Sequence, residues 1–105
     1  MDNENKSYIV VISDRAAQML VAHSRFLAQV SESAAVNLVK DFELKAKSLE
    51  LFPKRNPRLV STHVPSGKYR KLLLGKRYLL VYQIKGNTVH IDAVVDTRRD
   101  YEWLL

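Results

Sequence analysis

The part of the sequence best suited to chemistry is a long segment with charges of one sign. Between Glu50 and Asp92 there is no acidic residue, yet this segment holds nine basic ones. They are Lys54, Arg55, Arg58, Lys68, Arg70, Lys71, Lys76, Arg77 and Lys85. Such a segment repels itself in a folded domain, so it typically meets phosphates or an acidic partner. The ordinary alternative is a solvated surface. Tyr69, Tyr78 and Tyr82 lie between the basic residues and favour nucleic acid or an acidic protein.

Seven basic residues are candidates for binding a nucleic acid or another target. They are Lys68, Arg70, Lys71, Lys76, Arg77, Arg98 and Arg99. We expect Arg70 either to contact a phosphate or a partner's carboxylate, or to form an internal salt bridge with Asp92 or Asp96. Arg70 and Arg77 are expected to act through charge and planar geometry rather than through core packing.

The alternatives for the other basic residues are structural. Lys76 and Arg77 fall in a predicted turn, where a solvated side chain is the commoner outcome. Arg98 and Arg99 follow the last predicted strand, where a site is plausible. Their alternative is an ion pair with a nearby carboxylate that orders the end of the chain, namely that of Asp96, Asp100 or Glu102.

Most other chemistry finds no support in the sequence. His63 lies in a proline-rich loop and His90 is expected to face outward; either can titrate near neutrality. Neither histidine has a second ligand at a suitable spacing, so no metal site is predicted. Nucleotide-binding glycine motifs, a nucleophile elbow and paired catalytic carboxylates are absent, and no cofactor is expected.

Composition also excludes several classes of protein. The absence of cysteine rules out disulfides, thiolate metal sites and cysteine nucleophiles, and it agrees with a reducing, cytoplasmic location. The longest apolar run, from Tyr8 to Ile12, is five residues, far short of the roughly 20 that cross a bilayer. The polar opening is not that of a signal peptide, so no membrane association is expected.

At 105 residues the chain is expected to form one domain, with residues 1–7 as a flexible lead. The apolar run at 8–12 predicts a strand in the interior of a sheet. Ser13 or Asp14 caps a helix that ends near Val30, and residues 31–33 cap a second helix that stops before Pro53. These helices are predicted to form an antiparallel hairpin.

The second half of the chain is predicted to be a meander. All three prolines lie in residues 53–67, which predicts a loop that cannot be helical. Strands are expected at 68–74, 77–84 and 88–95, and residues 97–105 form a short helix or a docked strand extension. The predicted fold is α+β in the order β-α-α-β-β-β(-α). Its helix hairpin covers one face of a mainly antiparallel sheet and leaves the other face free for a target.

This order of elements, together with the stretch YRKLLLGKRYLLVYQIKGNTVHIDAVVDTRRDYEWLL at residues 69–105, resembles the RelE/ParE superfamily of toxins from type II toxin–antitoxin modules. In both, an arginine opens a strand, a glycine and basic residues turn it, a strand ends in Val-Tyr, and Arg-Arg-Asp-Tyr closes the chain. The resemblance implies a toxin, of the kind found in plasmid stabilisation modules, that is neutralised by an acidic, partly disordered antitoxin.

The superfamily contains two mechanisms. RelE-like members cleave mRNA on the ribosome, and ParE-like members inhibit DNA gyrase without chemistry. RNA cleavage needs a base, an acid and positive charge. The resemblance makes Arg70, Arg77, Arg98 and Tyr101 the catalytic candidates, but arginine cannot act as the base.

Two residues depart from the nuclease pattern. Asp96 stands where several nucleases carry a histidine or a basic residue, and Leu74 stands where RelE-like members have an arginine. The first strand and turn of the meander resemble ParE-like members more closely. Ribosome-dependent cleavage and gyrase inhibition remain open at this point. So do a non-toxic relic that binds an antitoxin for regulation and a basic nucleic-acid-binding domain.

Overall fold

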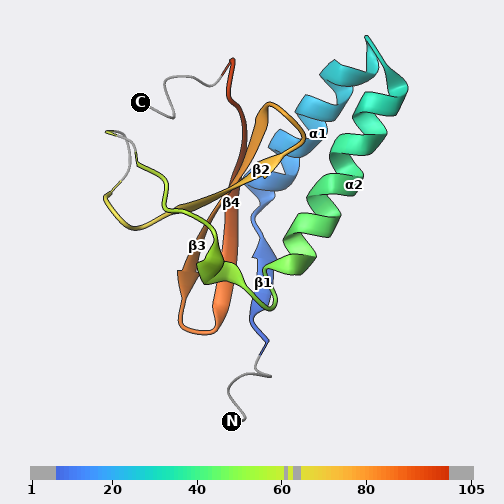
Figure 1. The fold of residues 1–105 in the computed structure, drawn as a ribbon. Coiled ribbons are helices and arrows are strands. Elements are labelled where there is room, and N and C mark those ends of the chain that lie inside the picture. Colours follow the sequence, from blue (N-terminus) through green and yellow to red (C-terminus); the bar gives the residue numbers. More distant parts are fainter. Residues whose placement is uncertain (1–6, 61, 63–64, 100–105) are drawn as a thin grey trace.

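The computed structural model describes residues 7–60, 62 and 65–99 of the chain. Its element order is β1 (Ile9–Ile12), α1 (Asp14–Ala28), α2 (Glu32–Ser48), the 3₁₀ helix η2 (Pro53–Arg55), β2 (Arg70–Leu74), β3 (Tyr78–Lys85) and β4 (Thr88–Asp96). The helix hairpin packs on one side of a single sheet (Figure 1). This arrangement confirms the predicted α+β class and element order. The predicted last helix and the lead fall largely outside the described residues.

Both helices begin at the predicted serine caps. The Ser13 hydroxyl accepts a hydrogen bond from the Ala16 amide at 3.0 Å, and the Ser31 hydroxyl accepts one from Ala34 at 3.2 Å. These bonds satisfy backbone donors that the first turn of a helix leaves unpaired. Neither helix of the described chain is long and apolar enough to cross a membrane.

The four strands form a mixed sheet in the order β1-β4-β3-β2. β1 pairs with β4 in parallel, whereas β2–β3 and β3–β4 are antiparallel. The predicted interior position of β1 is therefore wrong, because this strand has one neighbour and lies at an edge. Ile9 and Val11 are 58% and 43% exposed, while Val10 packs against the core. A short apolar run reports hydrophobicity but not the number of neighbouring strands.

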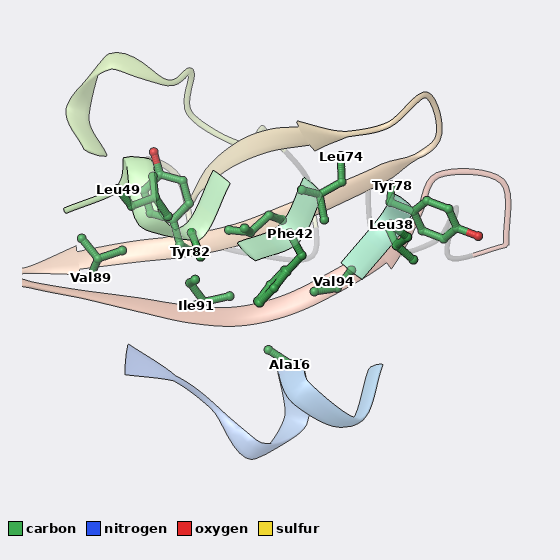
Figure 2. Close-up of a cluster of buried hydrophobic side chains, with 12 residues drawn as sticks. Ala16, Leu38, Phe42, Leu49, Leu74, Tyr78, Tyr82, Val89, Ile91 and Val94 are labelled. Atoms are coloured by element: carbon green, nitrogen blue, oxygen red, sulfur yellow. The ribbon is translucent and has the colours of Figure 1, made fainter. Parts of the chain in front are cut away.

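The main core lies between the sheet and the hairpin. Figure 2 shows Phe42 of α2 in the middle of this cluster, with Leu74 of β2 and with Ile91 and Val94 of β4 around it. Tyr82 and Leu49 extend the cluster towards the end of α2. Burial of this apolar surface fixes the hairpin on one face of the sheet.

The other face of the sheet is not left free, contrary to the prediction. Leu59, from the segment after η2, packs with Val81, Ala93 and Val95 in a second buried cluster, and all four are at most 2% exposed. The prediction that residues 53–67 contain no helix is also wrong, because Pro53 begins η2. Proline suits the first turn of a helix, where no backbone amide is needed.

Candidate functional site

Arg70 lies at the start of β2, on the same face as Leu72 and Leu74, opposite Tyr82. Its Nη1 donates to the carbonyl oxygens of Asn56 at 2.6 Å and Lys54 at 3.3 Å. The predicted internal salt bridge is therefore not formed: in the described chain, Arg70 bonds to loop carbonyls and not to Asp92 or Asp96. The Arg70 guanidinium thus holds the loop against the sheet.

The two carboxylates proposed for that bridge have other partners. Asp92 lies at a bulge between β3 and β4 and accepts a hydrogen bond from Gln83 Nε2 at 2.6 Å. Asp96 is buried and its Oδ1 accepts from the Arg98 amide at 2.9 Å. Asp96 therefore orders the turn after β4 through the backbone of Arg98.

The tyrosines that favoured nucleic acid stacking are not exposed. Tyr78 is 5% exposed and Tyr82 is fully buried. Tyr82 donates to the Pro53 carbonyl oxygen at 2.5 Å and accepts from Asn56 Nδ2 at 3.1 Å. Tyr69 is half-buried and packs at the second core cluster. The interleaved tyrosines are thus mainly core residues, and this reason for expecting nucleic acid fails.

Burial raises the pKa of two phenols, those of Tyr78 and Tyr82. Desolvation raises the pKa of Tyr78 above its ordinary value, and the Asp96 carboxylate raises this pKa further, against the opposing effect of Arg77 and Arg99. Desolvation likewise raises the pKa of Tyr82, against the Asn56 hydrogen bond and the charge of Arg70. Both tyrosines are therefore protonated near neutral pH and are poor general bases.

The β2–β3 turn and the helix hairpin enclose a groove of about 680 Å³. Leu27, Leu38 and Leu44 make it largely apolar, and Lys40, Lys76 and Arg77 lie along it. We call this feature the hairpin groove. Leu44 is 69% exposed, so the groove presents apolar surface to solvent. Among the described lining residues the acidic one is Asp41, which is held by the Gly75 amide at 2.8 Å and by Lys45 Nζ at 3.4 Å.

A second, smaller hollow lies at the other end of β3 and has a volume of about 410 Å³. Its lining is Lys54, Arg58, Gly67, Lys68, Arg70, Ile84 and Gly86. We call it the basic pocket. Lys54 and Arg58 were only part of a charge count in the sequence. Nothing in their local sequence indicated that the fold brings them to Lys68 and Arg70.

The remaining predicted site residues lie on different surfaces, except that Arg98 and Arg99 follow the end of β4 beside Arg77, where the Thr97 amide donates to the Arg77 carbonyl oxygen at 2.8 Å. Lys71 points to the opposite face from Arg70, in register with Val81. Arg99 lies over the Phe26 ring of α1 at 4.9 Å. Tyr101 and His63 lie outside the described residues. The seven binding candidates are therefore divided among the pocket, the far face, and the end of the sheet where the groove meets the end of β4.

One histidine without a predicted role has a defined place. His23 of α1 has Nε2 2.8 Å from the Val94 carbonyl oxygen, and its ring centroid is 5.1 Å from that of Tyr78. His90 is half-buried and in register with Gln83 on the far face. His23 thus ties α1 to the sheet.

Comparison with known proteins settles the family. The family described as the ParE toxin of type II toxin–antitoxin system, parDE, matches residues 10–101. The chain belongs to the ParE toxin family. It is thus a toxin of the type II toxin–antitoxin class, which bears out the superfamily resemblance of residues 69–105. No curated protein matches the chain significantly.

A solved structure has a similar fold to this ParE-family toxin. It is described as a chromosomal ParDE TA system from P. aeruginosa, with a TM-score of 0.68 and 20% sequence identity. The match covers 85% of this chain and 95% of the other. At this identity the likeness shows a shared fold, with the hairpin and sheet in the same arrangement, and no more.

Proposed function

We propose that this ParE-family toxin arrests growth by binding DNA gyrase without chemistry, and that an acidic antitoxin neutralises it by docking in the hairpin groove. The observation that supports the noncatalytic mechanism is the separation of Arg70 from the other described catalytic candidates. Arg70 is in register with Tyr82 in the second half of β3. Arg77 precedes β3 and lies beside the turn that carries Arg98, since the Thr97 amide donates to the Arg77 carbonyl oxygen at 2.8 Å. RNA cleavage needs a base, an acid and positive charge around one phosphate.

Two phenols close to these arginines, those of Tyr78 and Tyr82, are poor proton acceptors, because burial raises the pKa of both. Tyr82 also donates its proton to the Pro53 carbonyl oxygen. Asp96, which departs from the nuclease pattern, is buried and accepts from the Arg98 amide. A binding surface fits these groups better than a catalytic centre does.

The hairpin groove supports docking of an acidic antitoxin helix. Its apolar floor suits the apolar face of an amphipathic helix, which places anchors at helical spacing into such grooves. Lys40, Lys76 and Arg77 lie where acidic residues of that helix would meet them. Complementary charge of this kind favours fast and specific association. Asp41 offers little opposition, because the Gly75 amide and Lys45 already engage its carboxylate.

The test is antitoxin binding by a groove variant. Leu44→Asp places a carboxylate on the apolar floor, where it is desolvated and faces an acidic partner, so we expect binding at least about tenfold weaker. The partner in this test is the product of the gene adjacent to this toxin's gene. Calorimetry measures its affinity for the parent toxin and for each variant. Val36→Asp is the matched control, because Val36 is also exposed on α2 but lines a different hollow.

Each outcome bears on the proposal. Loss of binding in Leu44→Asp, with binding kept in Val36→Asp and both variants folded, supports groove docking. Equal binding by both variants overturns it. If the parent binds the partner but never arrests growth, the toxic function fails and the relic alternative holds.

A further inference from the structure

The basic pocket concentrates positive charge that the proposed function does not use. Of the described residues that line it, four are cationic and none is acidic. They come from three separate parts of the chain: Lys54 from η2, Arg58 from the segment that follows, and Lys68 and Arg70 from the start of the meander. No ion pair in the described part of the chain joins any of the four to a carboxylate.

Two of these cations are held directly opposite one another. Arg58 and Arg70 form an isolated antiparallel bridge. The Leu59 amide donates to the Tyr69 carbonyl at 2.8 Å, and the Lys71 amide donates to the Pro57 carbonyl at 3.0 Å. These flanking bonds make Arg58 and Arg70 a non-hydrogen-bonded pair, the closer of the two kinds. Like charges directly opposite one another destabilise a strand pair, so the arrangement favours an anion between them.

The pocket is also held in shape before any ligand arrives. The Arg70 guanidinium is fixed by the carbonyl oxygens of Asn56 and Lys54 through Nη1, which leaves its other N–H groups for a ligand. Arg58 Nη1 lies 3.4 Å from the point where a Cβ on Gly67 would stand. Gly67 has a φ of +76°, so a residue without a side chain both adopts this turn and leaves room for the guanidinium.

We propose that the basic pocket binds a phosphate group of a nucleic acid. A phosphate offers several acceptor oxygens to the planar forks of Arg58 and Arg70, and Lys54 and Lys68 add point charges. The volume of about 410 Å³ leaves room for the sugar that carries the phosphate. Ile84 and Gly86 at the β3–β4 turn complete the wall without adding a polar competitor. This site is independent of the hairpin groove and of how growth is arrested.

The experiment compares two double variants of equal net charge. Arg58→Gln/Lys68→Gln removes two pocket cations, and Arg25→Gln/Lys47→Gln removes two exposed cations from the helix hairpin. Fluorescence anisotropy with a labelled single-stranded oligonucleotide is measured at several salt concentrations. We expect the pocket variant to bind the oligonucleotide at least about tenfold more weakly than the parent. The magnitude of the slope of log affinity against log salt concentration should fall by about 1 to 2. The control should stay within about twofold, since long-range charge alone is screened by salt.

Competition identifies the source of the phosphate. If AMP and inorganic phosphate displace the labelled oligonucleotide at concentrations similar to each other, the pocket is a site for a single phosphate. Displacement only by unlabelled oligonucleotide supports a site for the nucleic acid backbone. Displacement by poly-glutamate as effective as by oligonucleotide overturns the proposal in favour of an acidic protein. Equal affinities and salt slopes in the two double variants overturn it too.

Urea denaturation of all variants keeps the comparison sound. Within the described residues, the side chains of Arg58 and Lys68 make no bond to a loop carbonyl of the kind that Arg70 makes, and Lys68 Nζ lies over the Tyr69 ring at 5.3 Å from its centroid. Both double variants should therefore unfold close to the parent midpoint. If the pocket pair proves less stable, single Lys54→Gln and Lys68→Gln variants replace it. A normal oligonucleotide affinity and salt slope in both of these folded variants then overturns the proposal.

Discussion

Arg70 uses one nitrogen to hold the fold and presents the rest of its guanidinium to the basic pocket. Arg77, at the other end of β3, has no such bond to a carbonyl among the described interactions and lies along the hairpin groove. From the sequence these two arginines look equivalent, since each lies at a strand end or turn. The structure separates them into one residue that also supports the fold and one that faces the groove.

Replacing each arginine by lysine separates these roles. Arg70→Lys loses the planar fork that reaches the Asn56 and Lys54 carbonyl oxygens, so we expect a loss of about 1 kcal/mol in the free energy of unfolding. Arg77→Lys should change it by no more than about 0.5 kcal/mol, because Arg77 is only partly buried and its guanidinium makes no carbonyl bond within the described residues. Urea denaturation measures both. Equal stabilities for the two variants would show that the Arg70 bonds contribute nothing net.

At the scale of elements, the sequence predicts those features that depend on interactions between residues close together in the chain. Ser13 and Ser31 cap helices because a hydroxyl reaches an amide three residues away, and this relation is visible in the sequence. The edge position of β1 depends on which strand pairs with Thr88–Asp96, so periodicity could not reveal it. The basic pocket also depends on a contact between distant parts of the chain, because an isolated bridge joins Arg58 to Arg70 across a proline-rich segment. The sequence alone could not reveal this contact.

The candidate site shows the same limit. Charge counting found the basic segment, and the turn signals placed Lys76 and Arg77 correctly between β2 and β3. The sequence could not show that Tyr78 and Tyr82 are core residues, because an aromatic residue in a strand has the same sequence pattern on either face. Nor could it show that Asp41 of α2 meets the Gly75 amide.

That contact links α2 to the β2–β3 turn and can be tested. Asp41→Ala removes the acceptor for the Gly75 amide and one of the two described partners of Lys45, so we expect a loss of about 1.5 to 3 kcal/mol in the free energy of unfolding. Glu43→Ala, an exposed change on the same helix, is the control and should have little effect. Chemical denaturation measures both. If Asp41→Ala is as stable as its control, the turn is held by packing and by the Lys45 hydrogen bond to the Leu73 carbonyl oxygen at 2.9 Å.

At the scale of the whole molecule, the two candidate surfaces lie at opposite ends of β3. Tyr78 borders the hairpin groove and Ile84 borders the basic pocket. Strand residues advance by about 3.3 Å each, so the two surfaces are roughly 20 Å apart along the strand. The two turns that flank β3 point to opposite ends of the sheet (Figure 1). An antitoxin helix in the groove would therefore leave the pocket open.

The proposal that this ParE-family toxin acts without chemistry is tested most directly by the first lesion that it causes in cells. Expression is induced, and mRNA 5′ ends and plasmid supercoiling are followed in the same samples over the first minutes. Inhibition of gyrase without chemistry predicts altered supercoiling or DNA breaks while mRNA ends stay as in uninduced cells. New mRNA ends at translated positions, appearing before any change in the DNA, would contradict the account.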